Sequence, residues 1–267
     1  MRASPHTKAT VRVALPTGFG INCEAETAHA FERAGAEVDA AHVNDLIAEP
    51  GRLARAQILA LAGGFSFGDH LGAGRALANR LRSGLSDTLE RFIADGGLVI
   101  GICNGFQTMV RLGLLPAGRP GPQQVTLAHN RHGAFYDGWV HLVAESASPC
   151  VYTRGLERID LPVRHGEGRL VAPAELVTAL NSEARIPLRY ADPLTGQPTE
   201  KFPHNPNGST EAAAALCDAS GRIFGLMPHP EAFLYPENHP AWRRRPKGSE
   251  PEGLRLFVNA VQACRGR

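Results

Sequence analysis

The chain has 267 residues, 43% of them hydrophobic, which is enough to bury the core of one large α/β domain or of two small domains. Its 28 basic residues nearly balance its 26 acidic residues, so no broad charged surface is available for nucleic acid or for an anionic membrane. No apolar run approaches the roughly 18 residues of a membrane span, and the amino terminus lacks the apolar core of a secretion signal. We therefore expect a cytoplasmic protein that binds small molecules or other proteins, with no nucleic acid and no membrane.

The cysteines argue against a disulfide framework and against a structural zinc site. They are odd in number, widely spaced and without any CxxC pair, at Cys23, Cys103, Cys150, Cys217 and Cys264. The "HNRH" stretch at 129–132 offers two histidines but no third ligand of matching spacing, and the sequence has no phosphate-binding GxxxxGK[ST] loop. We expect neither a metal nor a nucleotide cofactor on this chain.

The first part of the chain alternates between predicted strands and helices. A strand is predicted over 11–15, followed by a helix that Asn22 caps and Gly35 ends. The next predicted strand covers 36–43. Residues 58–64 ("ILALAGG") form a short apolar run that ends in paired glycines, which is typical of a buried parallel strand.

The same patterns predict further elements, with helices over 73–82, 86–95, 104–114 and 252–264 and strands over 97–103 and 221–230. Residues 120–200 are less regular and richer in proline, which indicates an antiparallel β-rich section with loops. The stretch 236–253 ("PENHPAWRRRPKGSEPEG") is expected to be a mobile, solvated basic loop.

Strands that alternate with helices at this spacing indicate βαβ units. We therefore predict an α/β fold with a mostly parallel sheet and helices on both faces, plus the antiparallel β-rich section. A disordered tail over 1–10 is expected to precede a single domain over 11–267. Ligands of such folds gather at the carboxyl ends of the strands, so the residues that follow the strands are the candidates for chemistry.

Cys103 lies in "VIGICNGFQTMV" (99–110), where a predicted strand runs directly into a helix. Gly101 and Gly105 flank it at two residues' distance, where side chains would block a sharp turn. Such a turn would expose the thiol at the top of the sheet, beside a helix N-terminus whose dipole favours the thiolate. The alternative is that Cys103 is simply a small buried residue, which is a common role for a free cysteine.

A thiol nucleophile needs a base and a group that orients the base. The stretch "MPHPE" supplies His229 and Glu231 at the end of a predicted strand. Residues two apart in an extended chain point to the same side, so the Glu231 carboxylate can meet the His229 ring. We predict Cys103, His229 and Glu231 as the catalytic residues.

Backbone N–H groups near Cys103 are candidates for an oxyanion hole. Asn104 begins the predicted helix, so its N–H is free to bind a developing oxyanion. The glycine-rich "LAGGFSFGDHLGAG" (61–74) follows a predicted buried strand, and Gly64 or Phe65 could offer a second N–H. The alternative for this stretch is a flexible connection without a role in chemistry.

The motifs "AGGFSFGD", "GICNGFQ" and "LMPHPE", in this order, resemble those of the class I glutamine amidotransferases, which carry a catalytic triad. Together with "HGEGR" (165–169) and "NPNGS" (205–209), they are most similar to the glutaminase subunits of phosphoribosylformylglycinamidine synthases, enzymes of purine biosynthesis. The resemblance spans residues 11 to 263 and implies the flavodoxin-like fold of that family.

The resemblance implies that Cys103 attacks the side-chain amide of L-glutamine and forms a γ-glutamyl thioester. Gln107 matches a glutamine-binding position of the family. Asn130 and Phe135 are taken as further glutamine contacts, although their "NRHGAF" loop departs from the family pattern. The ammonia would pass to a large synthetase subunit, with or without a small accessory subunit. That partner would bind the ATP and Mg²⁺ and convert formylglycinamide ribonucleotide to the amidine.

Other functions stay open at this point. The chain could be another triad-type amidotransferase, a free-standing γ-glutamyl cysteine hydrolase, or a non-catalytic regulatory subunit that has kept the fold. "HGEGR" and "NPNGS" count against the first two, and the intact set of Cys103, His229 and Glu231 counts against the last. Whether "HGEGR" and "NPNGS" face the partner or support the fold is also open, as is the effect of Ala232, where the family commonly has arginine.

Overall fold

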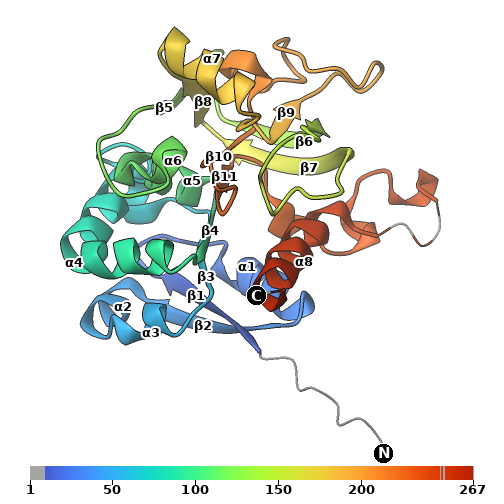
Figure 1. The fold of residues 1–267 in the computed structure, drawn as a ribbon. Helices are drawn as coiled ribbons and strands as arrows, with labels where there is room; N and C mark the ends of the chain where they lie inside the picture. Colours follow the sequence, from blue (N-terminus) through green and yellow to red (C-terminus); the bar gives the residue numbers. More distant parts are fainter. Residues whose placement is uncertain (1–9, 247, 249, 267) are drawn as a thin grey trace, which may run out of the picture.

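A six-stranded sheet forms the centre of the molecule (Figure 1). The computed structural model describes residues 10–246, 248 and 250–266. The strand order is β10-β11-β4-β3-β1-β2, and every neighbouring pair is parallel except β10 and β11. The six strands are β1 (Val11–Thr17), β2 (Ala36–His42), β3 (Ile58–Leu61), β4 (Leu98–Ile102), β10 (Ala215–Cys217) and β11 (Ile223–Leu226). The predicted mostly parallel sheet is confirmed.

Helices cover both faces of this sheet, as predicted. One face carries α1 (Glu24–Arg33) and α8 (Glu252–Arg265), which pack on each other, and the opposite face carries α4 (Arg75–Ala94) and α5 (Asn104–Leu112) (Figure 1). The remaining helices beside the sheet are short: α2 (Val43–Ala48), α3 (Gly51–Ala54) and α6 (Leu114–Ala117). None of the helices within the described residues is long and apolar enough to cross a bilayer.

The predicted β-rich section forms two small antiparallel sheets beside the main one (Figure 1). One sheet pairs β5 with β8, and the other has the order β7-β6-β9. Their bounds are β5 (Thr126–His129), β6 (Tyr136–Ala144), β7 (Arg158–His165), β8 (Glu167–Val171) and β9 (Leu188–Tyr190). The section also contains a helix that the sequence analysis missed, α7 (Ala174–Ser182).

Several predicted boundaries were wrong. The two helices expected over 73–82 and 86–95 are one helix, α4, because Leu77, Leu81, Leu85 and Leu89 continue a single buried stripe through the predicted break. Asn22 does not cap α1; the N-cap is Cys23, and it makes no side-chain capping bond. Residues 1–9 of the expected tail lie outside the described residues.

The stretch expected to be a mobile loop, 236–253, is attached to the domain through His239 and Arg245. His239 Nε2 and an Arg245 guanidinium nitrogen lie 3.3 and 3.2 Å from one Asp160 carboxylate oxygen on β7. Arg245 also pairs with Glu252 at the start of α8. Charges that look solvated in the sequence therefore bind partners distant in the chain.

The crossing of α5 over β3 and β4 depends on two glycines. A Cβ atom on Gly105 would overlap the carbonyl oxygen of Leu61, and a Cβ on Gly101 would overlap the Met109 sulfur. Neither glycine has a positive φ, so the constraint is the close approach and not an unusual backbone angle. Without side chains at these positions, α5 can begin directly on top of the strand ends.

We predict that Gly105→Ala destabilises the domain by about 1–3 kcal/mol or more, because backbone atoms of β3 cannot yield to the added methyl group. Gly121→Ala is the matched control, since a Cβ there meets nothing within 4 Å and its φ is not positive. Urea unfolding of both variants measures the difference. Equal stability of the two variants would contradict the packing argument.

Candidate active site

Three neighbouring strands of the main sheet end at the same edge. β3, β4 and β11 lie side by side in parallel, so the segments that follow Leu61, Ile102 and Leu226 meet there. These segments contain Gly64 and Phe65, Cys103 and Asn104, and His229 and Glu231. The sheet topology thus brings together the residues that the sequence predicted for catalysis.

Cys103 has a left-handed backbone, with φ 50° and ψ −105°, and it is the N-cap of α5. A positive φ in a side-chain-bearing residue is strained, and such strain clusters at functional sites. The Cys103 N–H donates to Leu226 O at 2.8 Å, which ties the turn to β11. The predicted sharp strand-to-helix turn is therefore present.

The thiol itself is less open than expected. Cys103 is only 6% exposed, because β7 passes over it and the Arg164 carbonyl oxygen lies 3.8 Å from Sγ. The sequence analysis placed the thiol on an open sheet edge, since it could not show that the β-rich section covers that edge. Cys103 is buried, as one alternative expected, and it also sits on the strained turn that the other alternative required. Its role as a nucleophile stays a prediction.

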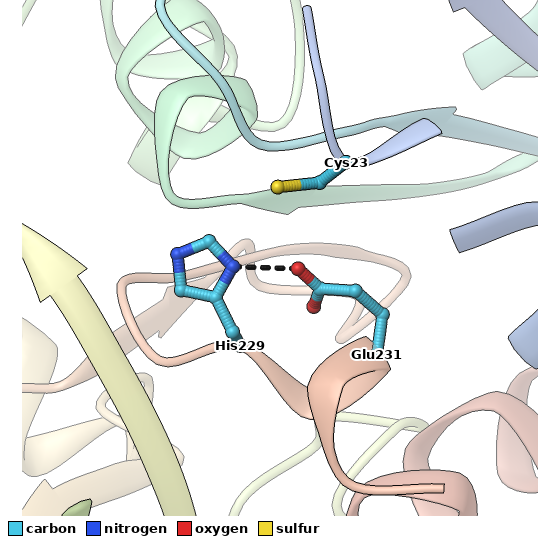
Figure 2. A group of neighbouring side chains, drawn as sticks. All are labelled: Cys23, His229 and Glu231. Atoms are coloured by element: carbon cyan, nitrogen blue, oxygen red, sulfur yellow. Dashed lines mark hydrogen bonds and ion pairs between the residues drawn. The ribbon is translucent and has the colours of Figure 1, made fainter. Parts of the chain in front are cut away.

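His229 and Glu231 form a buried pair. His229 Nδ1 and Glu231 Oε1 lie 2.5 Å apart, and each residue is 3% exposed (Figure 2). The backbone N–H of His229 donates to Pro162 O at 2.8 Å, which fixes the residue against β7. The predicted contact between carboxylate and imidazole is confirmed.

The electrostatic surroundings of His229 favour its protonated form. Burial opposes a charge on the ring, but the Glu231 carboxylate and the Cys103 thiol outweigh burial and raise the pKa of His229 well above its usual value. Its Nε2 atom is buried and has no hydrogen-bond partner among the described residues. This nitrogen is therefore free to exchange a proton with a substrate.

The expected oxyanion donors differ in availability. Asn104 is the first residue of α5, so its N–H has no partner within the helix. Gly64 N–H finds no acceptor among the described residues, and φ of +146° at Gly64 suits glycine. Phe65 N–H donates to Gly20 O at 2.9 Å and so is not free. Phe65 therefore offers no free N–H in this structure, and an oxyanion hole formed by Gly64 and Asn104 stays a prediction.

The Asn104 side chain links the two halves of the expected oxyanion hole. Its Oδ1 accepts from Ser66 N–H at 3.1 Å, and its Nδ2 donates to Asp69 Oδ1 and to Gln107 Oε1, each at 3.0 Å. Asn104 is 1% exposed. This buried amide holds the loop after β3 against the start of α5, a role that the sequence analysis did not assign to it.

Of the three expected glutamine contacts, two side chains are engaged elsewhere. Gln107 Nε2 donates to Glu167 O at 2.7 Å. Asn130 Nδ2 donates to Ala134 O at 3.0 Å and to His165 O at 2.8 Å. The Asn130 side chain therefore holds its loop in place, and its contact with glutamine, like that of Gln107, stays a prediction.

The third expected contact, Phe135, has an exposed ring. Its exposed fraction is 54%, and its backbone lies beside Gly166, between β7 and β8. Its contact with glutamine stays a prediction.

The "HGEGR" stretch forms one wall of the site. His165 is 3% exposed, and its Nδ1 lies 3.1 Å from Asn130 Oδ1. Burial, reinforced by the nearby His229, lowers the pKa of His165 to about 3, so its ring is neutral. A neutral ring adds no positive charge next to the protonated His229.

The "NPNGS" stretch supports this wall from behind. Asn207 Nδ2 donates to Gly168 O at 3.0 Å and Ser209 Oγ accepts from Leu170 N–H at 2.9 Å. Asn205 Nδ2 donates to Ser209 O at 3.1 Å. All three side chains are buried, so the stretch fixes β8. The sequence analysis had left a partner interface open for it, and the contacts indicate a structural role.

One residue beside the site was missed. Cys23 lies at the N-cap of α1, and its sulfur faces the His229–Glu231 pair (Figure 2). The only sequence signal for this was its position shortly after β1, a strand whose carboxyl end meets the same edge.

Comparison with known proteins agrees with this geometry. A family model described as a CobB/CobQ-like glutamine amidotransferase domain matches residues 10–264. The chain is 45% identical to the phosphoribosylformylglycinamidine synthase subunit PurQ of Dehalococcoides mccartyi, covering 92% of this chain and 94% of that protein. It is 40% identical to the PurQ subunit of Methanococcus maripaludis, covering 96% and 98% of the two chains.

Solved structures show the same fold. The chain superposes on a chain of the PurLQS structure from Thermotoga maritima with a TM-score of 0.71 and 27% identity, covering 96% of this chain and all of that one. A Thermotoga maritima glutamine amidotransferase matches with a TM-score of 0.52 and 14% identity, covering 96% and 98%. By its sequence over nearly its full length, the chain belongs to the CobB/CobQ-like glutamine amidotransferase family.

Proposed function

We propose that the chain is the glutaminase subunit of a phosphoribosylformylglycinamidine synthase, and that it acts in the cytoplasm. The observation that carries the proposal is the buried arrangement of Cys103 on a strained turn beside the His229–Glu231 pair. The PurQ subunits of two organisms, at 40 to 45% identity over almost the whole chain, support the choice of this synthase.

The reaction begins with the thiol. The Cys103 thiol proton passes to His229 Nε2 as Sγ attacks the side-chain amide carbon of glutamine, and the oxyanion that develops is stabilised by the N–H groups of Asn104 and Gly64. His229 gives a proton to the leaving nitrogen as the C–N bond breaks, so that ammonia departs and a γ-glutamyl thioester remains. His229 then takes a proton from the attacking water, and the thioester breaks down to glutamate and free Cys103.

Each residue of the triad has a physical reason for its role. The raised pKa of His229 keeps its proton available for the departing ammonia. Glu231, bound to Nδ1, leaves Nε2 as the nitrogen that exchanges protons. The cover of β7 over Cys103 excludes water from the first half of the reaction.

The ammonia passes to a large synthetase subunit, which converts formylglycinamide ribonucleotide to formylglycinamidine ribonucleotide. ATP and Mg²⁺ bind to that subunit, since this chain has no phosphate-binding loop. The PurLQS structure from Thermotoga maritima is consistent with such a partner, with an accessory subunit as a further component.

We predict that Cys103→Ala abolishes glutamine-dependent amidine formation by the reconstituted complex and leaves ammonia-dependent formation near the wild-type rate. The reason is that only the glutamine half-reaction uses the thiol. Steady-state assays with each nitrogen donor measure this. Cys264→Ala, which removes a partly buried thiol elsewhere in the chain, is the control. Glutamine hydrolysis by Cys103→Ala would refute the assignment of the nucleophile.

We predict that Glu231→Gln lowers kcat/KM for glutamine by about 10²- to 10⁴-fold, by analogy with loss of the carboxylate in Ser-His-Asp triads. The carboxylate raises the pKa of His229, so its removal lets the ring lose its proton at lower pH. The alkaline limb of the pH–rate profile should therefore move to lower pH. Glu237→Gln, on an exposed turn six residues further on, is the control. An alkaline limb that does not move in Glu231→Gln would count against the role of Glu231.

We predict that the isolated chain has weak glutaminase activity. Turnover of glutamine should be at least about tenfold faster when the large subunit and its nucleotide substrates are bound, because closure of the site by a partner couples ammonia release to its use. Glutamate formation with and without the partner measures the ratio. Equal rates would contradict the coupling.

A further inference from the structure

Cys23 has no role in the proposed reaction, yet its side chain lies against the reacting pair. Its sulfur faces the edge that the His229 ring and the Glu231 carboxylate share (Figure 2). The thiol makes a weak contact with Asn22 Oδ1 at 3.5 Å and interacts with the His229 ring, and the residue is only partly buried. It is therefore reachable from outside and able to change partner.

The three side chains form a compact set of donor atoms. Among the described residues, Cys23 Sγ, a His229 ring nitrogen and a Glu231 carboxylate oxygen all lie within 4.8 Å of one another. A second observation is independent of this proximity. Glu231 Oε2 is buried without a hydrogen-bond partner in the described part of the chain, and Glu231 is only 3% exposed. The carboxylate thus has unused capacity to bind a ligand.

The donor set is typical of zinc. Thiolate sulfur, imidazole nitrogen and carboxylate oxygen are the usual zinc ligands, at about 2.3 Å for sulfur and about 2.0–2.2 Å for nitrogen and oxygen. In a tetrahedral site these lengths put sulfur and nitrogen about 3.6 Å apart, so donors within 4.8 Å need a shift of roughly 1 Å. The partly exposed Cys23 side chain can supply that shift, and His229 Nδ1 and Glu231 Oε1, now 2.5 Å apart, must separate to about 3.4 Å to hold the metal between them.

We propose that Cys23, His229 and Glu231 form an inhibitory site for a zinc-type divalent cation. The cation takes the place of the proton that His229 Nδ1 and Glu231 now share. Bonds form from the metal to Sγ, Nδ1 and a carboxylate oxygen, and the thiol proton and the ring proton leave to water. No oxidant is needed, and a chelator reverses the binding.

Loss of glutamine hydrolysis follows because the metal removes the link that orients His229, without a bond to the nucleophile Cys103. This inhibition rests on the proposed function, whereas the binding itself does not. The "HNRH" histidines at 129–132, which were considered for metal binding from the sequence, are not part of this group.

The test measures zinc binding to the full chain by competition with a chromophoric chelator. We expect one zinc per chain for the wild type, an affinity within about threefold of the wild type for Cys103→Ala, and at least tenfold weaker binding for Cys23→Ser. Cys264→Ser, which removes another partly buried thiol, should bind as the wild type does. Circular dichroism and thermal unfolding establish that each variant is folded.

Several results would overturn the site. These are no zinc binding by the wild type, unchanged binding by Cys23→Ser, or loss of binding in Cys103→Ala, which would place the metal on the nucleophile instead. Glutaminase assays then test inhibition, with each rate normalised to the same variant without metal. Cys23→Ser should need at least tenfold more zinc than the wild type for the same fractional inhibition. If the expected binding pattern is found but the wild-type complex does not hydrolyse glutamine, the site stands and the proposed function fails.

Discussion

The close crossing of helix α5 over the ends of β3 and β4 is the constraint on which the rest of the site depends. Gly101 and Gly105 allow it because any side chain would enter the space of Met109 or the Leu61 backbone. The chain must reverse within one residue, so Cys103 takes a positive φ and its sulfur lies above the sheet edge. The same crossing places the first free N–H groups of α5 beside that sulfur.

The β-rich section completes the site from the other side. β7 covers Cys103 with the Arg164 carbonyl and binds the His229 backbone through Pro162. Behind it, buried amides hold β8 and the 130–135 loop in place by donating to backbone carbonyl groups. The section therefore acts as a cover, which explains why the Cys103 thiol is only 6% exposed.

Charge in the site is organised around His229. Glu231 and Cys103 raise its pKa, while the neighbouring His165 is kept neutral by burial and contributes no second positive charge. This division suits acyl transfer, in which one imidazole must hold a proton for the leaving group. The same arrangement leaves a carboxylate, an imidazole and the thiol of Cys23 close together, so a group built to move a proton is also able to bind a soft metal ion.

The sequence by itself determined the parts of this protein that depend on near neighbours in the chain. The strand-to-helix turn at Cys103 and the His229–Glu231 pair were readable because their partners are within a few residues. Helix α4 depends on near neighbours as well, through its continuous buried stripe, but the sequence pattern was interpreted as two helices instead of one. The alternation of strands and helices also predicted the sheet and its helix-covered faces.

Only the tertiary structure decided which groups are free to react. The N–H of Phe65 donates to Gly20 O, and the Asn130 amide donates to the carbonyl of His165 on β7. The sheet edge above Cys103 is covered by β7, whose Arg164 lies 61 positions further along the chain. Cys23 likewise lies close to His229 although the two residues are far apart in the chain. A local pattern shows which atoms a residue can offer, whereas contacts between distant segments decide which of those atoms are already paired.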